Sequence, residues 1–309
     1  MLLKCFLSIC VIFVAIYTTY FPGRHAVHYN YIEDELISSE LLIEKRTNIE
    51  PNLKPCNYYD LIVNNYEVDI NDIYNEKDIH APQPGGWFRP TECDPLVKAA
   101  IIVPYRNRTK QLKIFLNYMH YFLQKQHIEY RIIIVHQNDS LPFNRAKMIN
   151  YGAKTAMNLK YDCLILHDID LIPLNLGNIY GCVKNPRHMS SSLDTFRYNL
   201  PYLTLFGGAI SISSEHFMKV NGFSNMFYGW GGEDDDFYKR LKLNDISSCR
   251  FSPKLSKYIM LNHKKEKPTK DRYERLKSSE ERFKSDGVSQ LSSNYDIVNK
   301  NLYTAIYAA

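Results

Sequence analysis

The chain has 309 residues, of which 45% are hydrophobic and 23% charged, a composition typical of a globular protein with one sizeable core and a smaller appendage. The formal net charge of +5 is mild. The Lys/Arg-rich segment 254–284 carries interleaved acids and matches no nucleic-acid-binding module, so we expect no nucleic-acid partner.

The N-terminus contains an uncharged apolar run, "CFLSICVIFVAIYTTYF" at residues 5–21, at the short end of the range that spans a bilayer. A cleaved signal peptide is the alternative, but no clear small-x-small cleavage site follows the run. We therefore expect an uncleaved transmembrane signal anchor, with residues 1–4 in the cytosol. The rest of the chain would then lie in the secretory lumen.

Residues 22–80 show little periodicity and are expected to form a luminal stem that orders only towards the core. The Pro/Gly-rich stretch "APQPGGWFRPTECDP" marks a boundary, after which a catalytic domain is expected at residues 81–309. Within it, buried strands are predicted at residues 99–103 and 130–137 and one within 161–173, with helices within 111–126 and 143–159. This alternation indicates an α/β fold with a mostly parallel sheet covered on both faces.

Polar motifs follow each predicted strand: "PYRNR", "FNRAK" and "HDID". Ligands of such sheets bind outside the carboxyl ends of the strands. Alternation along the third strand would place Asp168 and Asp170 on one side, where carboxylates can bind Mg²⁺ or Mn²⁺ bridged to a diphosphate. Arginines suit phosphate oxygens, and this site would have Arg106, Arg108 and Arg145. The simpler alternatives are a chance Asp-x-Asp turn and surface salt bridges.

The stretch "YGWGGEDDDFYKR", residues 228–240, places four consecutive acids behind a Gly-rich run. One interpretation is an acidic helix start, which the helix dipole favours. The other is a catalytic loop, in which the glycines let the backbone approach a ligand and Trp230 stacks on a sugar. A carboxylate among like charges has a raised pKa and can act as a base near neutrality. The residues alone leave both interpretations open.

Together, "VPYRNR", "FNRAK", "HDIDLIP", "PRHMSSSLD", "LPYLTLFGGAISIS", "NGFSNMFYGWGGEDDDFYKRL" and "SDGVSQL" closely resemble, in the same order, the β1,4-galactosyltransferase family. The resemblance runs from about Cys93 to about Leu291. It implies a Golgi type II membrane protein with a GT-A fold, which is a Rossmann-like, mostly parallel α/β architecture. It also implies an inverting, Mn²⁺-dependent enzyme that moves a sugar from a UDP donor to the 4-hydroxyl of a β-linked GlcNAc.

The resemblance assigns roles residue by residue. The catalytic base would be Asp234, and the Mn²⁺ ligands Asp170, Met260 and His263. Chemistry alone would leave Met260 as core packing, because a thioether is a soft ligand. Donor-binding residues would be Pro104, Tyr105, Arg106, Asn107, Arg108, Phe143, Asn144, Arg145, Asp168, Ile169, Leu205 and Trp230. Acceptor-binding residues would be Gly208, Gly232, Glu233, Asp235, Arg272, Tyr273 and Leu276.

The resemblance also implies disulfides Cys56–Cys93 and Cys163–Cys182 and leaves Cys249 as a free thiol. Thr195 stands where many vertebrate members have a Lys that touches the donor, and the segment between His263 and Arg272 is shorter than usual.

The resemblance implies that Leu205 stands where members using UDP-Gal usually have Tyr, beside the donor's C2 substituent. The resulting apolar recess could hold an N-acetyl methyl group, so UDP-GalNAc is expected to serve at least as well as UDP-Gal. The expected acceptors are GlcNAc-terminated glycans. The alternatives are a strict UDP-Gal enzyme, a catalytically silent sugar-binding protein and a metal-dependent phosphohydrolase.

Overall fold

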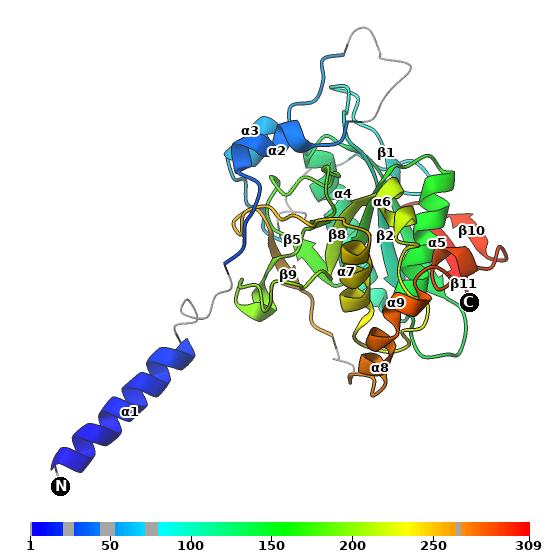
Figure 1. The fold of residues 1–309 in the computed structure, drawn as a ribbon. Helices are drawn as coiled ribbons and strands as arrows, with labels where there is room; N and C mark the ends of the chain where they lie inside the picture. The colour runs from blue at the N-terminus through cyan, green and yellow to red at the C-terminus, as the bar shows by residue number, and fades with distance from the viewer. Residues whose placement is uncertain (1, 21–27, 44–52, 72–79, 264–266) are drawn as a thin grey trace.

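The computed structural model describes residues 2–20, 28–43, 53–71, 80–263 and 267–309 (Figure 1). Parts of the expected tail, anchor and stem, and part of the short segment before Arg272, lie outside these ranges. The helices are α1 Leu2–Tyr20, α2 Asp34–Glu40, α3 Tyr59–Val63, α4 Thr109–Lys125, α5 Arg145–Asn158, α6 Ser214–Lys219, α7 Glu233–Leu243, α8 Arg272–Lys277 and α9 Ser279–Arg282, with short 3-10 turns η3 Asp194–Phe196 and η4 Val288–Gln290.

The strands are β1 Trp87–Phe88, β2 Lys98–Tyr105, β3 Glu129–Gln137, β4 Cys163–His167, β5 Leu171–Pro173, β6 Arg187–His188, β7 Ser192–Leu193, β8 Ala209–Ser213, β9 Lys257–Met260, β10 Asp296–Asn299 and β11 Thr304–Ala308. The larger sheet has the order β10-β11-β3-β2-β4-β8-β6, with β1 beside β3. Its centre, β11-β3-β2-β4, is parallel as expected, whereas β8, β6 and β10 pair antiparallel. A smaller sheet has the order β5-β9-β7.

Successive residues of the central strands point to opposite faces, and each face has its own buried cluster. Ile101 of β2 packs with Phe115 and Phe122 of α4, whereas Ile102 packs with the apolar side of α5. Residues in the middle of these strands are almost all apolar because both faces are covered. The expectation of a sheet with helices on both faces is therefore confirmed.

The stretch 161–173 forms two strands, so the prediction of one strand there is wrong. β4 ends at His167, and the chain turns before it enters β5 in the smaller sheet. The turn is fixed by hydrogen bonds from Asp168 N to the Gly208 carbonyl (3.0 Å) and from Leu171 N to the Asp168 carbonyl (3.3 Å). The Asp-x-Asp carboxylates therefore belong to a turn between two sheets and not to one side of a strand.

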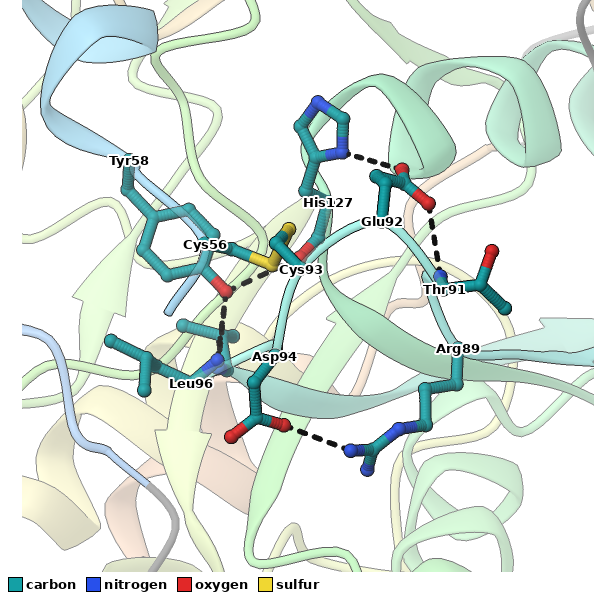
Figure 2. The surroundings of a disulfide bond; sticks show 10 residues. Cys56, Tyr58, Arg89, Thr91, Glu92, Cys93, Asp94, Leu96 and His127 are labelled. Atoms are coloured by element: carbon teal, nitrogen blue, oxygen red, sulfur yellow. Dashed lines mark hydrogen bonds and ion pairs between the residues drawn. A yellow bond between two sulfur atoms is a disulfide. The ribbon is translucent and has the colours of Figure 1, made fainter. Parts of the chain in front are cut away.

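Much of the expected stem is part of the core. Ile37 of α2 and Ile62 of α3 are fully buried in the same cluster as β2 and α4. The Cys56–Cys93 disulfide joins this region to the chain before β2, and the Tyr58 hydroxyl accepts a hydrogen bond from Leu96 N (3.1 Å; Figure 2). Packing thus extends well N-terminal to the expected boundary at residue 81.

Both expected disulfides are present, because Cys163 is also bonded to Cys182. Cys249 is a free thiol, as expected. The anchor expected at residues 5–21 falls largely on α1, which is drawn apart from the sheets in Figure 1. Among the described residues, no helix combines the length and the hydropathy needed to cross a membrane.

Candidate active site

Polar groups from four segments meet at the carboxyl end of the parallel strands, and Arg145 joins them. Its Nε donates to Asp168 Oδ1 (2.6 Å), its Nη1 lies 3.7 Å from Glu233 Oε1, and its Nη2 donates to the Gly208 carbonyl (3.5 Å). Arg145 was expected to bind phosphate, but two carboxylates already engage it. Its buried Nη1 has no hydrogen-bond partner among the described residues, only the ion pair with Glu233.

Two of the three expected metal ligands, Asp170 and His263, are in contact, and the third, Met260, lies close by along the backbone. His263 Nδ1 lies 3.0 Å from Asp170 Oδ2, and Leu261 N donates to the Asp170 carbonyl (2.7 Å). Met260 stands at the end of β9, beside β5, and its amide donates to Asp194 Oδ1 (3.0 Å). Within the described residues no three His, Cys, Asp or Glu side chains form a metal-binding group, so the thioether would have to complete the set.

Burial raises the pKa of Asp170 to about 6, and the negative charge of Asp168 adds to this effect. A buried carboxylate of this kind gains from a nearby cation. Carboxylate and imidazole are suitable ligands for Mn²⁺, and the thioether is the weakest member of the set. The residues present therefore fit a divalent transition-metal ion bound at Asp170 and His263.

The four acids begin helix α7, as the interpretation of the block as an acidic helix start predicts. Gly231 and Gly232 have φ of 103° and 99°, a backbone conformation that favours glycine, and they lead the chain into the helix at Glu233. A Cβ on Gly207 would lie 2.6 Å from Asp234 Oδ2. The first turn of α7 therefore packs its expected base directly against Gly207.

The acids of α7 have different surroundings. Burial and the neighbouring Asp234 raise the pKa of Glu233 to about 7. Burial also raises the pKa of Asp234, and burial together with the Asp234 charge raises that of Asp235. The fourth acid, Asp236, is fully buried and pairs with Arg240 (2.7 Å), so it belongs to the core. Only the first three acids face the site.

The acceptor-side residues gather around Trp230, which is 53% exposed. The Arg272 guanidinium lies 5.8 Å from the Trp230 ring centroid and 4.6 Å from that of Tyr273. Thr269 N donates to the Trp230 carbonyl (3.1 Å), which joins the Gly-rich loop to the chain before α8. Leu276 lies one turn along α8 and is partly buried. This side offers exposed aromatic faces suited to a sugar.

On the donor side, Pro104 and Tyr105 end strand β2, and Asn107 and Arg108 follow in the loop before α4. The Arg106 guanidinium lies 5.2 Å from the Phe143 ring centroid.

The side chains of two expected donor-binding residues, Asn144 and Ile169, are engaged within the fold. Asn144 is fully buried, with its side chain accepting from Lys147 N (2.9 Å) and donating to the Asn225 carbonyl (2.7 Å). The Ile169 side chain is buried in the core, which leaves only its backbone for a ligand.

Two side chains near the site were missed by the sequence analysis. The Tyr202 hydroxyl donates to Asp235 Oδ1 (3.3 Å), and Arg250 Nη2 donates to the carbonyl of Leu205 (2.9 Å). Tyr202 lies in the quoted motif "LPYLTLFGG", so its position was a signal that could have been used. Arg250 lies outside every quoted motif and had no such signal.

Family models and known proteins match most of the chain. The model described as the N-terminal region of glycosyl transferase group 7 matches residues 51–183, and the one described as the N-terminal domain of galactosyltransferase matches residues 187–264. Bos taurus β-1,4-galactosyltransferase 1 is 40% identical over 72% of this chain, and Homo sapiens β-1,4-galactosyltransferase 6 is 41% identical over 80%. The matched part spans 56% and 65% of these relatives, respectively.

Two solved structures are similar in fold. The catalytic domain of Drosophila β1,4-galactosyltransferase 7 with xylobiose has a TM-score of 0.59 and 26% identity, covering 69% of this chain and 92% of that one. A mutant of the Drosophila enzyme in complex with manganese, UDP-Gal and xylobiose has a TM-score of 0.57 and 25% identity, with the same coverage.

Proposed function

The chain belongs to the β1,4-galactosyltransferase family, and on that premise we propose that it is a Mn²⁺-dependent transferase. It would move GalNAc or Gal from a UDP-sugar to the 4-hydroxyl of a terminal β-linked GlcNAc. The proposal rests mainly on one observation: Arg145 contacts both Asp168 in the Asp-x-Asp turn and Glu233 at the start of α7. Purified protein incubated with Mn²⁺, a GlcNAc acceptor and a panel of UDP-sugars tests it directly. Release of phosphate or UDP without sugar transfer would contradict the proposal.

In the proposed reaction, Asp170, His263 and Met260 would hold the metal. The ion would neutralise charge on the diphosphate leaving group. Asp234 accepts the proton of the acceptor's 4-hydroxyl while that oxygen attacks C1 of the donor sugar. The bond from C1 to the diphosphate oxygen breaks on the opposite face, so the anomeric configuration inverts.

The residues around the metal site and Asp234 would bind and orient the donor and the acceptor. The Arg108 charge acts on Asp170 of the metal turn, and Arg106 and Arg108 would supply positive charge for the phosphates. The exposed rings of Trp230 and Tyr273 offer apolar faces to the acceptor. Arg145 keeps the Asp168 turn and Glu233 at a fixed separation, which positions the donor relative to Asp234.

Removal of the His263 imidazole is expected to weaken Mn²⁺ binding. His263→Ala should raise the Mn²⁺ concentration for half-maximal activity by at least the roughly 10–100-fold that loss of a residue supporting a metal ligand costs. Titration of activity and of Mn²⁺ binding, followed by electron paramagnetic resonance, measures the effect. His127→Ala is the matched control, because His127 pairs with Glu92 on the surface (2.8 Å; Figure 2). Equal Mn²⁺ requirements in both variants would show that His263 is not a ligand.

We propose that Leu205 favours UDP-GalNAc. A tyrosine at this position would crowd the donor's acetamido group, and overpacking costs about 1–3 kcal/mol. If fully expressed in the transition state, that cost changes rates roughly five- to 150-fold. Leu205→Tyr should therefore shift the ratio of the two donor rates towards UDP-Gal by such a factor. Leu203→Tyr is the control, because Leu203 is an exposed residue of the same loop. A wild-type enzyme that strongly prefers UDP-Gal, with a ratio unchanged by Leu205→Tyr, would refute this donor assignment.

We also propose that residues 5–21 anchor the enzyme in the Golgi membrane with its catalytic domain in the lumen. Apolar side chains such as Phe6 and Phe13 are exposed along α1, and the two disulfides suit an oxidising compartment. The full chain should stay with the membrane fraction after alkaline extraction, and its C-terminus should be protected from added protease. Release of a product lacking residues 1–21 would instead indicate a cleaved signal peptide.

A further inference from the structure

We propose that Tyr29 and Arg250 are positioning residues for the loop at residues 201–205. The N-terminal segment 28–43 would then help to hold the active-site loop in place. This loop carries Leu205, next to the proposed donor, and Tyr202, whose hydroxyl donates to Asp235 Oδ1 (3.3 Å). The inference rests on the proposed function, because it concerns how the site holds the two substrates.

The loop at residues 201–205 is held mainly by contacts with other parts of the chain. Residues 201–204 are all exposed, and Leu203 is exposed to 54%. The loop forms one internal turn, in which Leu205 N donates to the Tyr202 carbonyl (3.2 Å). Arg250 spans this turn, because its Nη2 donates to the carbonyls of both Leu203 (2.8 Å) and Leu205 (2.9 Å). One guanidinium group therefore fixes the backbone on both sides of residue 204.

Arg250 is in turn held by the N-terminal segment. Its guanidinium carbon lies 5.2 Å from the ring centroid of Tyr29, within the range of a cation–π contact. The Tyr29 hydroxyl is hydrogen-bonded to Ser191 Oγ (2.8 Å), which fixes the ring. At the backbone, Ile32 N donates to the Arg250 carbonyl (3.0 Å). The segment thus contacts both the side chain and the main chain of Arg250.

The segment is itself firmly attached to the domain. Ile37 is fully buried in the core, and Leu42 N donates to the Cys182 carbonyl (2.8 Å). Asp34 accepts from Ser252 Oγ (2.8 Å) and lies 2.6 Å from Lys254 Nζ, two and four residues after Arg250. The family match begins at residue 51, so this support comes from a part of the chain outside the matched region.

Loss of this support has a specific consequence. A loop that moves more would hold Tyr202 and Leu205 less closely, so the acceptor's KM should rise and donor discrimination should fall. The Mn²⁺ requirement should stay unchanged, because the proposed metal ligands lie on the turn after β4 and at and just after the end of β9. General destabilisation would not produce this combination.

The test compares Tyr29→Leu and Arg250→Lys with wild type in the full chain. Leucine removes the ring, and lysine cannot reproduce a guanidinium that bonds two carbonyls. We expect faster amide hydrogen exchange at residues 202–206 and an acceptor KM raised about two- to thirtyfold, the range that a cation–π contact is worth. Tyr29→Phe keeps the ring but loses the hydrogen bond to Ser191, so its exchange and KM should lie between those of wild type and Tyr29→Leu. Tyr59→Leu is the control, since Tyr59 is an exposed tyrosine of α3 at a distance from the loop in the sequence.

Unchanged exchange at residues 202–206 in both Tyr29→Leu and Arg250→Lys would overturn the inference. Faster exchange with a raised acceptor KM supports it, whether or not the donor ratio moves. If the loop loosens and the ratio of the two donor rates stays the same, the positioning role holds and Leu205 is refuted as the donor determinant. Absence of transfer activity in the wild type would refute the proposed function, while the exchange measurement would still decide the role of Tyr29 and Arg250.

Discussion

Asp234→Asn is expected to lower kcat by at least the roughly 10²–10⁴-fold that removal of a general base costs. The amide has the shape of the carboxylate, which matters because a Cβ on Gly207 would already lie 2.6 Å from Asp234 Oδ2. An amide oxygen cannot take the proton of the acceptor hydroxyl. Folding and UDP binding should therefore be preserved while turnover is lost.

The pH profile gives a second measurement of the same assignment. Burial raises the pKa of Asp234, and a base works only when deprotonated, so wild-type kcat should fall as the pH drops through that raised pKa. The residual activity of Asp234→Asn should lack this acid limb. Asp245→Asn is the control, because Asp245 is an exposed carboxylate just beyond the end of α7. Near-normal turnover of Asp234→Asn would exclude Asp234 as the base.

The central sheet was predictable because its signal is local. The apolar runs of β2 and β3 and the helical spacing of α4 can be read within windows of fewer than 20 residues. The split between β4 and β5 was not predictable in this way. β5 is a three-residue strand whose partner, β9, lies more than 80 residues later, so only tertiary pairing defines it. The packing of Ile37 and Ile62 was missed for a related reason, since their short helices carry little periodicity.

For the site as well, local motifs were predictable and tertiary orientation was not. The motifs at the strand ends identified Asp170 and Arg145, and the resemblance supplied His263, which the structure places 3.0 Å from Asp170. The sequence could not separate the roles of the four acids, although one signal was available. Asp236 and Arg240 are spaced i, i+4, which places them on one face of a helix. What the spacing cannot show is that this face is turned into the core.

Asp236→Asn is expected to have the opposite effect to Asp234→Asn: a large loss of stability with little change in chemistry. Asp236 Oδ2 lies 2.7 Å from Arg240 Nε, and both side chains are fully buried. Removing one partner of a buried ion pair costs about 3–5 kcal/mol, because the other charge is left in a medium of low polarity. Asp286 Oδ2 still lies 3.4 Å from Arg240 Nη2, so the lower end of that range, about 3 kcal/mol, is expected.

Urea unfolding of the two asparagine variants, with kcat measured per folded molecule at low temperature, separates the roles of adjacent carboxylates. Asp234→Asn should keep the wild-type midpoint and lose turnover. Asp236→Asn should unfold at lower urea concentration and keep turnover, because its carboxylate faces away from the site towards Arg240 and Arg282. The reverse pattern would mean that the catalytic carboxylate is two residues further along α7. Since the two substitutions are chemically identical, only the direction in which each side chain points can account for a difference between them.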